Sequence, residues 1–577
     1  MSADLSDKRH VLTVALEDYF QVGAFNQVIQ RGQWYRFETR LERNADRALA
    51  LLDRHNLKGT FFVLGWIADR FPELVKKVAD RGHEIASKGY YHRGISHMTP
   101  AEFKEDSQRS REALEHACGR KVIGYRVADR WLRPEDLWAL DVLAEVGYGY
   151  DSSIAPTGRA FAHDPFRRYL HKHEANGRAL WELPISTSKI CGLQIPIAGG
   201  NYFRQLPPLL IRPAVARWHR NVDAPLVLYF HVWELDPDQP TISASSRLTK
   251  IRHYRNLHKM EGYLDYFFQQ YRFTSAADYL GLSTALGAAQ ERRFAAPEWQ
   301  PDYPVAPNEP LTGSRTPVTV VVPCYNEELI LPYLANTLAS VSEKLARDYT
   351  LTFALVDDGS KDDTWAGLKR AFGGKPGFEL YRHEHNRGVA AAIMTGIARS
   401  RNEIVCSIDC DCTYDPHSLA EMIPLLRPGV DLVTASPYHP DGHVRNVPAW
   451  RLRLSRTASW LYRRVLRQKL YTYTSCFRVY RRSAVAEIEL RQTNFLGVAE
   501  LLGKLDLQGS QIVEFPATLE VRMLGRSKMR TFRMILGHLV LMTRLYASRC
   551  FGRPPIHPED EAANLTDANV PERTVAR

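Results

Sequence analysis

Two long stretches of the 577-residue chain alternate short apolar segments with segments of helical period. Between residues 10 and 281, apolar runs such as VLTVAL, GTFFVLGW and LVLYFHVW are separated by patterns such as ADRALALLDRHN, whose apolar positions recur at helical spacing. A second series begins at VTVVVP and continues to about residue 552. Alternation of short strands with helices predicts an α/β fold, either a β/α barrel or a doubly wound sheet, for each stretch.

The segments between and after these two series have no periodicity. Residues 282–315 are rich in proline and alanine, which is typical of a linker, and residues 553–577 are polar and predict a disordered tail. We therefore expect a first domain over residues 1–281 and a second over residues 316–552. Two domains agree with the length, because a chain of this size is too long for one hydrophobic core.

Positive charge is concentrated in the second domain. The chain has a formal net charge of +11, and residues 421–555 alone hold 22 Lys and Arg against 9 Asp and Glu. Residues 450–471 and 531–551 place apolar side chains near helical spacing among Arg and Lys, without any acid. Basic amphipathic helices of this kind bind anionic membranes. The alternative, in which both helices pack on the domain core, stays open.

The sequence gives no support for a nucleic-acid partner or for a membrane-spanning segment. The chain has no motif typical of nucleic-acid binding, so we expect no nucleic-acid partner. The first residues, MSADLSDKRH, are polar, and no apolar run approaches the ~18 residues that a spanning helix requires. We expect a cytoplasmic protein that is peripheral to the inner face of the cytoplasmic membrane.

Six motifs of the first domain occur in a recognisable order: TFFVLGWIADRFPELVKKVADRGHEIAS, GYRV, YDSS, LPIS, AGGNYFR and LYFHVWELDP. In this order they resemble the polysaccharide deacetylases of the nodulation-deacetylase type, especially the subgroup of exopolysaccharide export loci. The resemblance implies a distorted (β/α) barrel that holds one divalent metal ion by an Asp-His-His set. An acidic base and a late histidine acid would complete the site.

The same resemblance assigns roles to residues of this chain. It implies that Glu17 is the base, Asp18 the metal carboxylate, His92 the second metal histidine and His231 the acid, with Arg126 beside the base. These positions keep the residue types that the family's chemistry requires.

Three other positions depart from the family pattern. Lys88 replaces the first metal histidine, Ala15 stands where relatives often have Asp, and Val127-Ala128 replaces Ala-Pro. A protonated lysine offers a metal ion no lone pair, so we expect Lys88 to pair with Asp18, the metal to be absent and hydrolysis to be lost. In the alternative, Lys88 points to solvent and a weaker site functions with His97 or a water.

The second domain places carboxylates at the ends of its expected strands. Four motifs carry this arrangement: VTVVVPCYNEE, FALVDDGSKDDT, RHEHNRGVAAAIMTGIARS and IVCSIDCDCTYDP. Ligands of open parallel sheets bind at the carboxyl edge of the strands, and Asp409 and Asp411 could share a divalent cation with a diphosphate there. Together with YTYTSCFRVYRR and RMLGRSKM, these motifs resemble the family 2 glycosyltransferases, and within them the dolichol- or polyprenyl-phosphate sugar synthases.

This second resemblance implies a glycosyltransferase-A fold, which is Rossmann-like, and a site for a nucleotide sugar with Mg or Mn held by Asp409 and Asp411. The residues implied for the nucleotide sugar are Pro323, Tyr325, Glu327, Asp358 and Asp409. Those implied for the phosphates of acceptor or donor are Arg478, Arg522, Ser527 and Lys528. The implied catalytic set is Asp409, Asp411, Arg478, Glu500 and Lys528.

The acceptor is indicated by a missing carboxylate. Relatives with sugar acceptors often carry Asp two residues before the position of Glu500, where this chain has Val498. A sugar hydroxyl needs a base, whereas a lipid phosphate is already an anion. We predict inverting transfer of a sugar from a nucleotide donor to a polyprenyl phosphate, by an enzyme fused to an inactive deacetylase-like domain. Two alternatives stay open: a first domain that still removes an acyl group, and a non-catalytic glycan-binding module.

Overall fold

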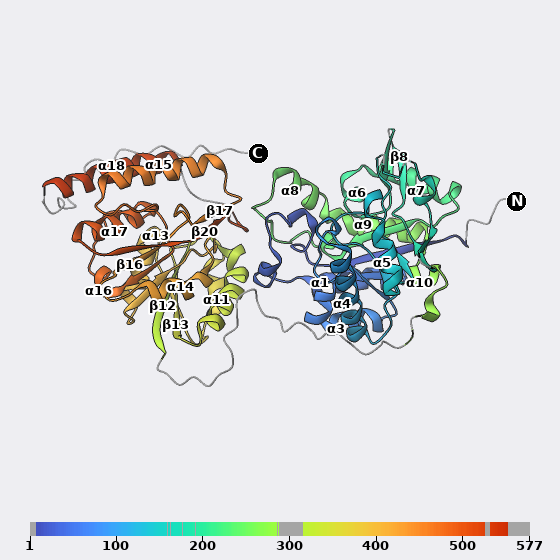
Figure 1. Cartoon of the computed structure of the whole chain (residues 1–577), viewed down its shortest axis with the longest axis horizontal. Helices are drawn as coiled ribbons and strands as arrows, with labels where there is room; N and C mark the ends of the chain where they lie inside the picture. Colours follow the sequence, from blue (N-terminus) through green and yellow to red (C-terminus); the bar gives the residue numbers. More distant parts are fainter. Residues whose placement is uncertain are drawn as a thin grey trace. The chain divides into compact units, whose positions relative to one another are not determined.

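The structure is a computed structural model of the whole chain, and it divides into two compact units, Met1–Val305 and Ala306–Arg577 (Figure 1). Both units are mixed α/β, which confirms the predicted fold class. The residues that the structure describes are 7–285 except 159, 162, 176 and 191, then 287, 315–525 and 531–551. Most of the expected linker, and the expected tail, lie outside this part of the chain.

A mostly parallel sheet forms the centre of the first domain, in the order β10-β1-β2-β3-β4-β5-β7-β6, with β11 also paired to β1. Only β6 and β7 run antiparallel to each other. Strands β2 and β3 are buried along their whole length, as expected for a parallel sheet covered on both faces. The strands are β1 (Arg9–Leu16), β2 (Thr60–Val63), β3 (Glu84–Ser87), β4 (Gly124–Tyr125), β5 (Tyr150–Asp151), β6 (His171–Ala175), β7 (Arg178–Glu182), β10 (Val227–His231) and β11 (Arg272–Thr274), with β8 (Thr187–Ile190) and β9 (Leu193–Pro196) as a separate hairpin.

Helices follow most strands of this domain, as the sequence pattern predicts. The longest, α4, begins after Thr99, which forms a capping box with Glu102, and ends at Gly119, whose left-handed backbone (φ 70°) suits glycine. The helices are α1 (Leu41–Arg54), α2 (Gly65–Arg70), α3 (Pro72–Asp80), α4 (Pro100–Cys118), α5 (Trp138–Val146), α6 (Gly200–Gln205), α7 (Pro208–Asn221), α8 (Arg247–Tyr254), α9 (Met260–Gln270) and α10 (Ala276–Tyr279).

The second domain has a seven-stranded sheet in the order β14-β13-β12-β15-β18-β16-β19. Strand β18 runs antiparallel to both neighbours, and the other pairs are parallel. The strands are β12 (Thr316–Cys324), β13 (Tyr349–Asp357), β14 (Phe378–Arg382), β15 (Ile404–Ser407), β16 (Leu432–Ser436), β18 (Arg478–Arg481) and β19 (Ile512–Pro516), with β17 (His443–Arg445) paired to β20 (Thr518–Glu520).

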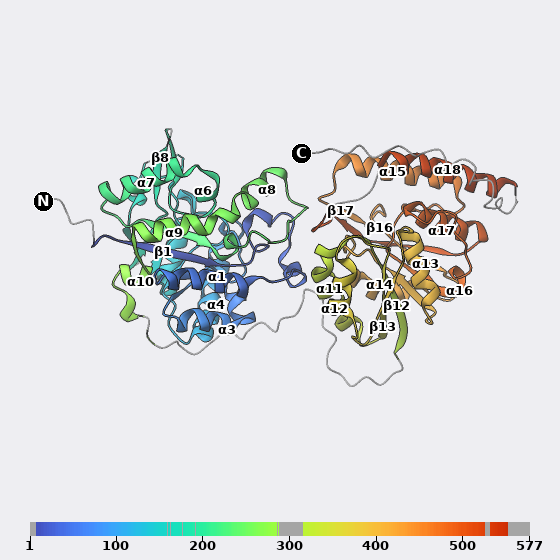
Figure 2. The same ribbon diagram turned by 180° about the vertical axis from the view of Figure 1, so that it is seen from behind.

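Two helices with basic side chains, α15 (Ala449–Val465) and α18 (Thr531–Phe551), pack side by side (Figures 1 and 2). The helix expected over 450–471 is shorter than predicted, because Leu466 is extended and the Asp506 carboxylate accepts the N–H groups of the next two residues. No helix in the described ranges is both long and apolar enough to span a membrane. The other helices are α11 (Leu331–Leu345), α12 (Thr364–Phe372), α13 (Val389–Arg399), α14 (Leu419–Met422), α16 (Arg482–Val485) and α17 (Phe495–Gln508).

Candidate active sites

The second domain gathers carboxylates from two loops around one arginine. Asp409 and Asp411 follow the carboxyl end of β15, and Glu327 follows that of β12. Arg522 Nε lies 3.2 Å from Asp411 Oδ2, and its guanidinium also contacts Glu327 Oε2. The guanidinium therefore bridges two loops at the edge of the sheet where ligands of such folds bind.

The electrostatics of this cluster favour a bound cation. Burial, together with the negative charge of Asp411, raises the pKa of Asp409 to about 7. Within the described residues, no three His, Cys, Asp or Glu side chains are placed to hold a metal ion on their own. Asp409 and Asp411 offer carboxylate oxygens, the donors that a hard divalent cation such as Mg²⁺ or Mn²⁺ prefers, so these two residues would hold such an ion.

The Asp358 carboxylate organises the loop that follows β14. It accepts the N–H groups of Arg387 (2.8 Å) and Gly388 (2.7 Å), and its Oδ1 lies 2.7 Å from His383 Nδ1. His383 Nε2 lies 2.9 Å from Thr395 Oγ1 on α13. Sequence reasoning missed His383, although a histidine directly after an expected strand was a signal that could have identified it.

The other residues expected to bind the nucleotide sugar, Pro323, Tyr325 and Glu327, lie at the carboxyl end of β12. Pro323 is the next to last residue of this strand, and Tyr325 directly follows it. The N–H group of Glu327 donates to Thr364 Oγ1 at 2.7 Å, which fixes the loop against the start of α12. The structure therefore brings Pro323, Tyr325 and Glu327 to the same sheet edge as the Asp409 and Asp411 pair.

Arg478 and Glu500, two residues expected at the catalytic centre, form hydrogen bonds with the backbone of the chain itself. Arg478 is fully buried on β18 and donates to the carbonyl oxygens of Val498 (2.8 Å) and Tyr473 (2.9 Å). This corrects the expectation that Arg478 binds a phosphate, because its guanidinium is directed into the domain interior.

Glu500 is likewise engaged by the chain itself. Its carboxylate accepts the N–H groups of Arg491 (3.1 Å) and Gln492 (2.8 Å) and lies 2.9 Å from Lys504 Nζ. These contacts hold the loop before α17 in place, and the expected catalytic role of Glu500 stays a prediction. Ser527 and Lys528 lie outside the described residues.

In the first domain one carboxylate meets three basic side chains. Glu17 Oε2 contacts Lys88 Nζ and lies 3.4 Å from His92 Nε2, and Glu17 Oε1 lies 3.4 Å from His231 Nε2. Glu17 follows β1, Lys88 follows β3 and His231 ends β10, so the sheet brings them together. Burial disfavours the ionised form, but the charge of Lys88 and a hydrogen bond from His92 hold the pKa of Glu17 well below its usual range.

The expected pairing of Lys88 with Asp18 is wrong. The Asp18 carboxylate accepts hydrogen bonds from Thr39 Oγ1 and from the N–H of Arg40, each at 2.8 Å. Burial raises the pKa of Asp18 to about 6, against the effect of these bonds. Glu17 and Asp18 are successive residues just beyond a strand, and their side chains have separate surroundings.

Arg126 is also placed differently from the expected position beside the base. Its hydrogen bonds go to the carbonyl oxygen (3.0 Å) and hydroxyl (2.8 Å) of Ser152 and to Thr13 Oγ1 (3.0 Å). Its guanidinium also lies over the ring of Phe62. The contacts of Arg126 are therefore with the interior of the sheet.

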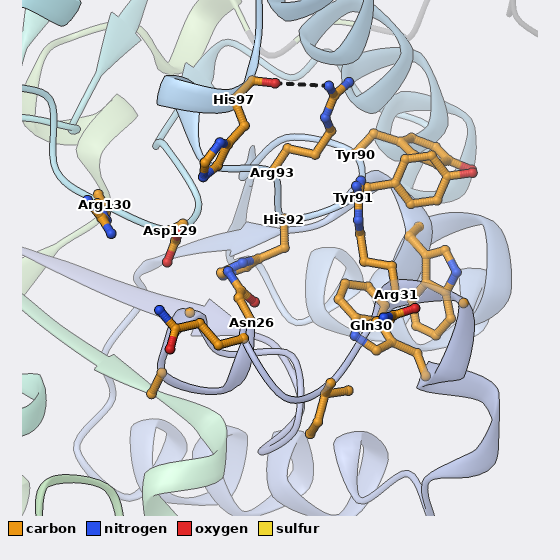
Figure 3. Close-up of a pocket in the computed structure, with 18 of the residues that line it drawn as sticks. Asn26, Gln30, Arg31, Tyr90, Tyr91, His92, Arg93, His97, Asp129 and Arg130 are labelled. Atoms are coloured by element: carbon orange, nitrogen blue, oxygen red, sulfur yellow. Dashed lines mark hydrogen bonds between the residues drawn. The ribbon is translucent and has the colours of Figure 1, made fainter. Parts of the chain in front are cut away.

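A cavity of about 1300 Å³ opens beside His92. Figure 3 shows Tyr90, Tyr91 and Arg31 on one side of it and His97, Asp129 and Arg130 on the other, with His92 between them. His92 has the left-handed backbone (φ 54°) that is uncommon for residues other than glycine, and its buried Nδ1 has no hydrogen-bond partner among the described residues. Further aromatic side chains line the cavity, namely Trp34, Tyr35 and Trp66.

Family models match three segments of the chain. They describe a polysaccharide deacetylase over residues 32–134, a domain of unknown function (DUF3473) over residues 152–281 and a glycosyl transferase of family 2 over residues 319–489.

Several known proteins are similar to part of the chain. Polyprenol monophosphomannose synthase of Mycolicibacterium smegmatis is 30% identical over 232 residues, which cover 39% of this chain and 85% of that protein. Dodecaprenyl-phosphate galacturonate synthase of Rhizobium johnstonii is 29% identical over 247 residues, or 41% of this chain and 70% of that protein. Among solved structures, the chain is similar to glucosyl-3-phosphoglycerate synthase from Mycobacterium tuberculosis, which was solved with Mn²⁺, uridine diphosphate and glucosyl-3-phosphoglycerate. The two are 20% identical, the match covers 42% of this chain and 81% of that protein, and the TM-score is 0.31.

Proposed function

The chain belongs to the family 2 glycosyltransferases, with a polysaccharide deacetylase domain ahead of the transferase, and from this we propose that it moves a sugar from a nucleotide sugar to a polyprenyl phosphate. The observation that carries the proposal is the cluster of Asp409, Asp411, Glu327 and Arg522 at the carboxyl edge of the sheet. Two of the relatives named above, polyprenol monophosphomannose synthase and dodecaprenyl-phosphate galacturonate synthase, are by name synthases of polyprenyl-linked sugars, which agrees with a lipid phosphate as acceptor.

Three residues of the cluster, Asp409, Asp411 and Arg522, and the nearby Asp358 would contribute to such a transfer. A divalent cation held by Asp409 and Asp411 would supply positive charge that offsets the charge of the leaving diphosphate. Arg522 adds a guanidinium, whose planar fork suits phosphate oxygens, at the same place. Asp358 keeps the 383–388 loop next to the site in a fixed conformation.

The surroundings of α17 support a phosphate acceptor rather than a sugar hydroxyl. Val498 offers no carboxylate at the position where relatives with sugar acceptors often have one, and Glu500 is held by N–H groups and by Lys504. A phosphate oxygen is already negative, so it can attack the anomeric carbon without a base. The bond from that carbon to the nucleoside diphosphate breaks as the new bond forms, which inverts the configuration.

The exposed faces of α15 and α18 support association with the membrane at its inner face. α18 packs against both α15 and α17 and buries Leu541, Met542 and Leu545. The large apolar side chains that these two helices leave exposed are Trp450, Leu454, Trp460, Ile535, Leu536, Leu539, Val540, Tyr546 and Phe551. Each helix packs one face on its neighbours and leaves another face exposed, so packing on the domain is compatible with the proposed membrane contact.

The transfer reaction is tested with the purified protein in detergent, a panel of nucleotide sugars and undecaprenyl phosphate, with products identified by mass. We expect one lipid-linked sugar phosphate. A product that forms only on free sugars would show that the acceptor assignment is wrong.

Membrane association is tested by replacing Arg463, Arg464 and Arg467 by Glu. Binding to anionic vesicles should weaken by about 100-fold or more, since each basic residue near such a surface contributes about 1 kcal/mol. The matched control reverses Lys369, Arg370 and Lys375, three exposed cations of α12 and the turn after it. Equal loss in both variants would mean that only net charge matters.

We further propose that the first domain binds a glycan without hydrolysing it. Support comes from the contact of Lys88 with Glu17, where the family has a metal histidine, and from the aromatic walls of the cavity beside His92.

This proposal is tested by deacetylase activity and zinc content. The full chain should remove no acetyl group from chito-oligosaccharides. K88H should bind more zinc than the parent protein, because it adds an imidazole beside Glu17 and His92. Equal zinc content together with deacetylation by the parent would favour a bifunctional enzyme.

A further inference from the structure

The exposed apolar side chains of the first domain are unevenly distributed. Among its described residues, every large apolar side chain that the structure leaves exposed comes from the segment 166–251, and none from 7–165, which contains Glu17 and Lys88. The exposed set is Phe166, Tyr169, Leu193, Leu209, Leu210, Leu248 and Ile251. Single exposed apolar residues are common, but a concentration in one segment marks a candidate interaction surface.

The elements that carry these side chains are neighbours in space. α8 packs against α6, and α7 packs against β8. Gln205, the last residue of α6, donates from Nε2 to the carbonyl oxygens of Ile251 (3.3 Å) and Arg252 (3.1 Å), and the chain enters α7 three residues later. Figures 1 and 2 show β8, α6, α7 and α8 along one edge of the domain. We call this surface the α7–α8 edge, defined by Leu193, Leu209, Leu210, Leu248 and Ile251.

The α7–α8 edge is basic as well as apolar. Helices α7 and α8 contain no Asp or Glu, and from residue 239 to residue 260 the chain has no acid at all. On α8, Leu248 (75% exposed) and Ile251 (52% exposed) alternate with cations. The cations of the two helices are Arg212, Arg217, Arg220, Arg247, Lys250 and Arg252, and Arg255 follows α8.

Helix α8 also borders two hollows of the domain. A hollow of about 570 Å³ is lined by Lys250 and Arg255 together with Thr241, Ile251 and Tyr254, so two cations lie beside apolar surface. Thr249, on the same helix, lines the cavity of about 1300 Å³ that opens beside His92. Whatever contacts α8 is therefore adjacent to the cavity of the deacetylase-like domain.

We propose that the α7–α8 edge docks on an anionic bilayer, with Leu248 and Ile251 in the interface and the cations of α8 at the level of the lipid phosphates. Apolar side chains separated by cations suit a lipid interface. Between residues 239 and 260 the cations are accompanied by no acid, so the charge of this segment complements an anionic bilayer. This surface belongs to the first domain, whereas α15 and α18 belong to the second, and the docking proposal does not depend on the transferase reaction.

Docking at this edge has a consequence for the ligand of the first domain. Because α8 forms part of the cavity rim, a docked domain presents that cavity to glycans attached to membrane lipids. This step rests on the proposed glycan-binding role, whereas the docking itself does not.

The test uses the full chain with Arg463, Arg464 and Arg467 replaced by Glu, so that binding through α15 is suppressed. The vesicles consist of phosphatidylcholine, with or without phosphatidylglycerol. Replacing Arg252 and Arg255 by Glu in this background should weaken sedimentation with the phosphatidylglycerol vesicles by about 30-fold. The control reverses Arg120 and Lys121, two exposed cations in the segment between α4 and β4.

Hydrogen exchange and an uncharged variant provide independent readouts. Amides of residues 247–255 should become protected when phosphatidylglycerol vesicles are added, and L248S should reduce binding while leaving the melting temperature unchanged. The proposal fails if the two charge reversals weaken binding equally. It also fails if residues 247–255 are equally protected without vesicles, which would mean that protein covers α8. Transfer to detergent-dispersed polyprenyl phosphate is measured separately, so a failure of docking is distinguishable from a failure of the proposed transferase function.

Discussion

In both domains a carboxylate beyond the end of a parallel strand meets a cation from the same chain, but the two cations differ in origin. Lys88 directly follows β3, and its side chain and that of Glu17 are only 5% and 2% exposed. Arg522 reaches Asp411 and Glu327 from the segment after β20, and its side chain is 15% exposed. A cation next to a buried strand has little freedom to move, whereas one on a more accessible segment can be exchanged.

This difference agrees with the proposal that the first site binds no metal ion and that the second site binds one. In the first domain the ammonium compensates the Glu17 charge permanently, and a metal ion would have to displace a buried ion pair. In the second domain Arg522 compensates Asp411 and Glu327 while leaving them able to change partner. On this proposal, the Lys88–Glu17 pair stabilises the first domain, whereas Arg522 can give up its contact with Asp411 when a ligand binds.

The largest effect is expected from removing the permanent cation. Lys88→Ala should destabilise the first domain by about 3–5 kcal/mol, because Glu17 would stay buried without its main counter-charge. The measurement is urea unfolding of the full chain, followed by signals from the first domain. The double variant E17Q with K88M keeps the volume and removes both charges, so it should recover most of the loss. A Lys88→Ala protein as stable as the parent would show that Lys88 is not the permanent partner of Glu17.

In the second domain, a change at the carboxylate should affect reaction rate rather than stability. Asp411→Asn keeps the volume of the side chain but removes the charge that would hold a cation and its diphosphate, so transfer should fall by about 100-fold or more. The melting temperature should stay close to that of the parent. The control is Asp441→Asn, at an 80% exposed side chain of the same domain. Transfer within a few-fold of the parent would contradict the assignment of Asp411.

The fold and the location of both sites could be predicted from sequence, because strand and helix periods and motif order are local properties. The apolar runs VLTVAL and VTVVVP became the buried strands β1 and β12. The motifs at their ends lie at carboxyl edges of sheets, since parallel strands all end on the same side.

The partners of individual side chains could not be predicted in the same way. Glu17 and Asp18 are adjacent, and only the backbone geometry after β1 decides which of them meets Lys88. An arginine such as Arg478 is a residue type that often binds phosphate. Its position on β18, an antiparallel strand inside the sheet, instead directs its guanidinium to carbonyl oxygens. The contact of Arg522 with Glu327 joins residues 195 positions apart, which no local pattern encodes.

The smallest expected effect tests whether Arg522 is an exchangeable cation. Arg522→Ala removes a charge that competes with a metal ion for Asp411, so Mn²⁺ alone, measured by calorimetry without nucleotide, should bind about fivefold more tightly. Transfer should nevertheless fall, because the phosphates lose a guanidinium. Arg445→Ala is the matched control, since Arg445 pairs with Glu520 at 3.6 Å on the neighbouring β17 and β20 pair and does not contact Asp411. If Mn²⁺ affinity is the same in both variants, Arg522 does not compete for the site, and the contrast between a permanent and an exchangeable cation is lost.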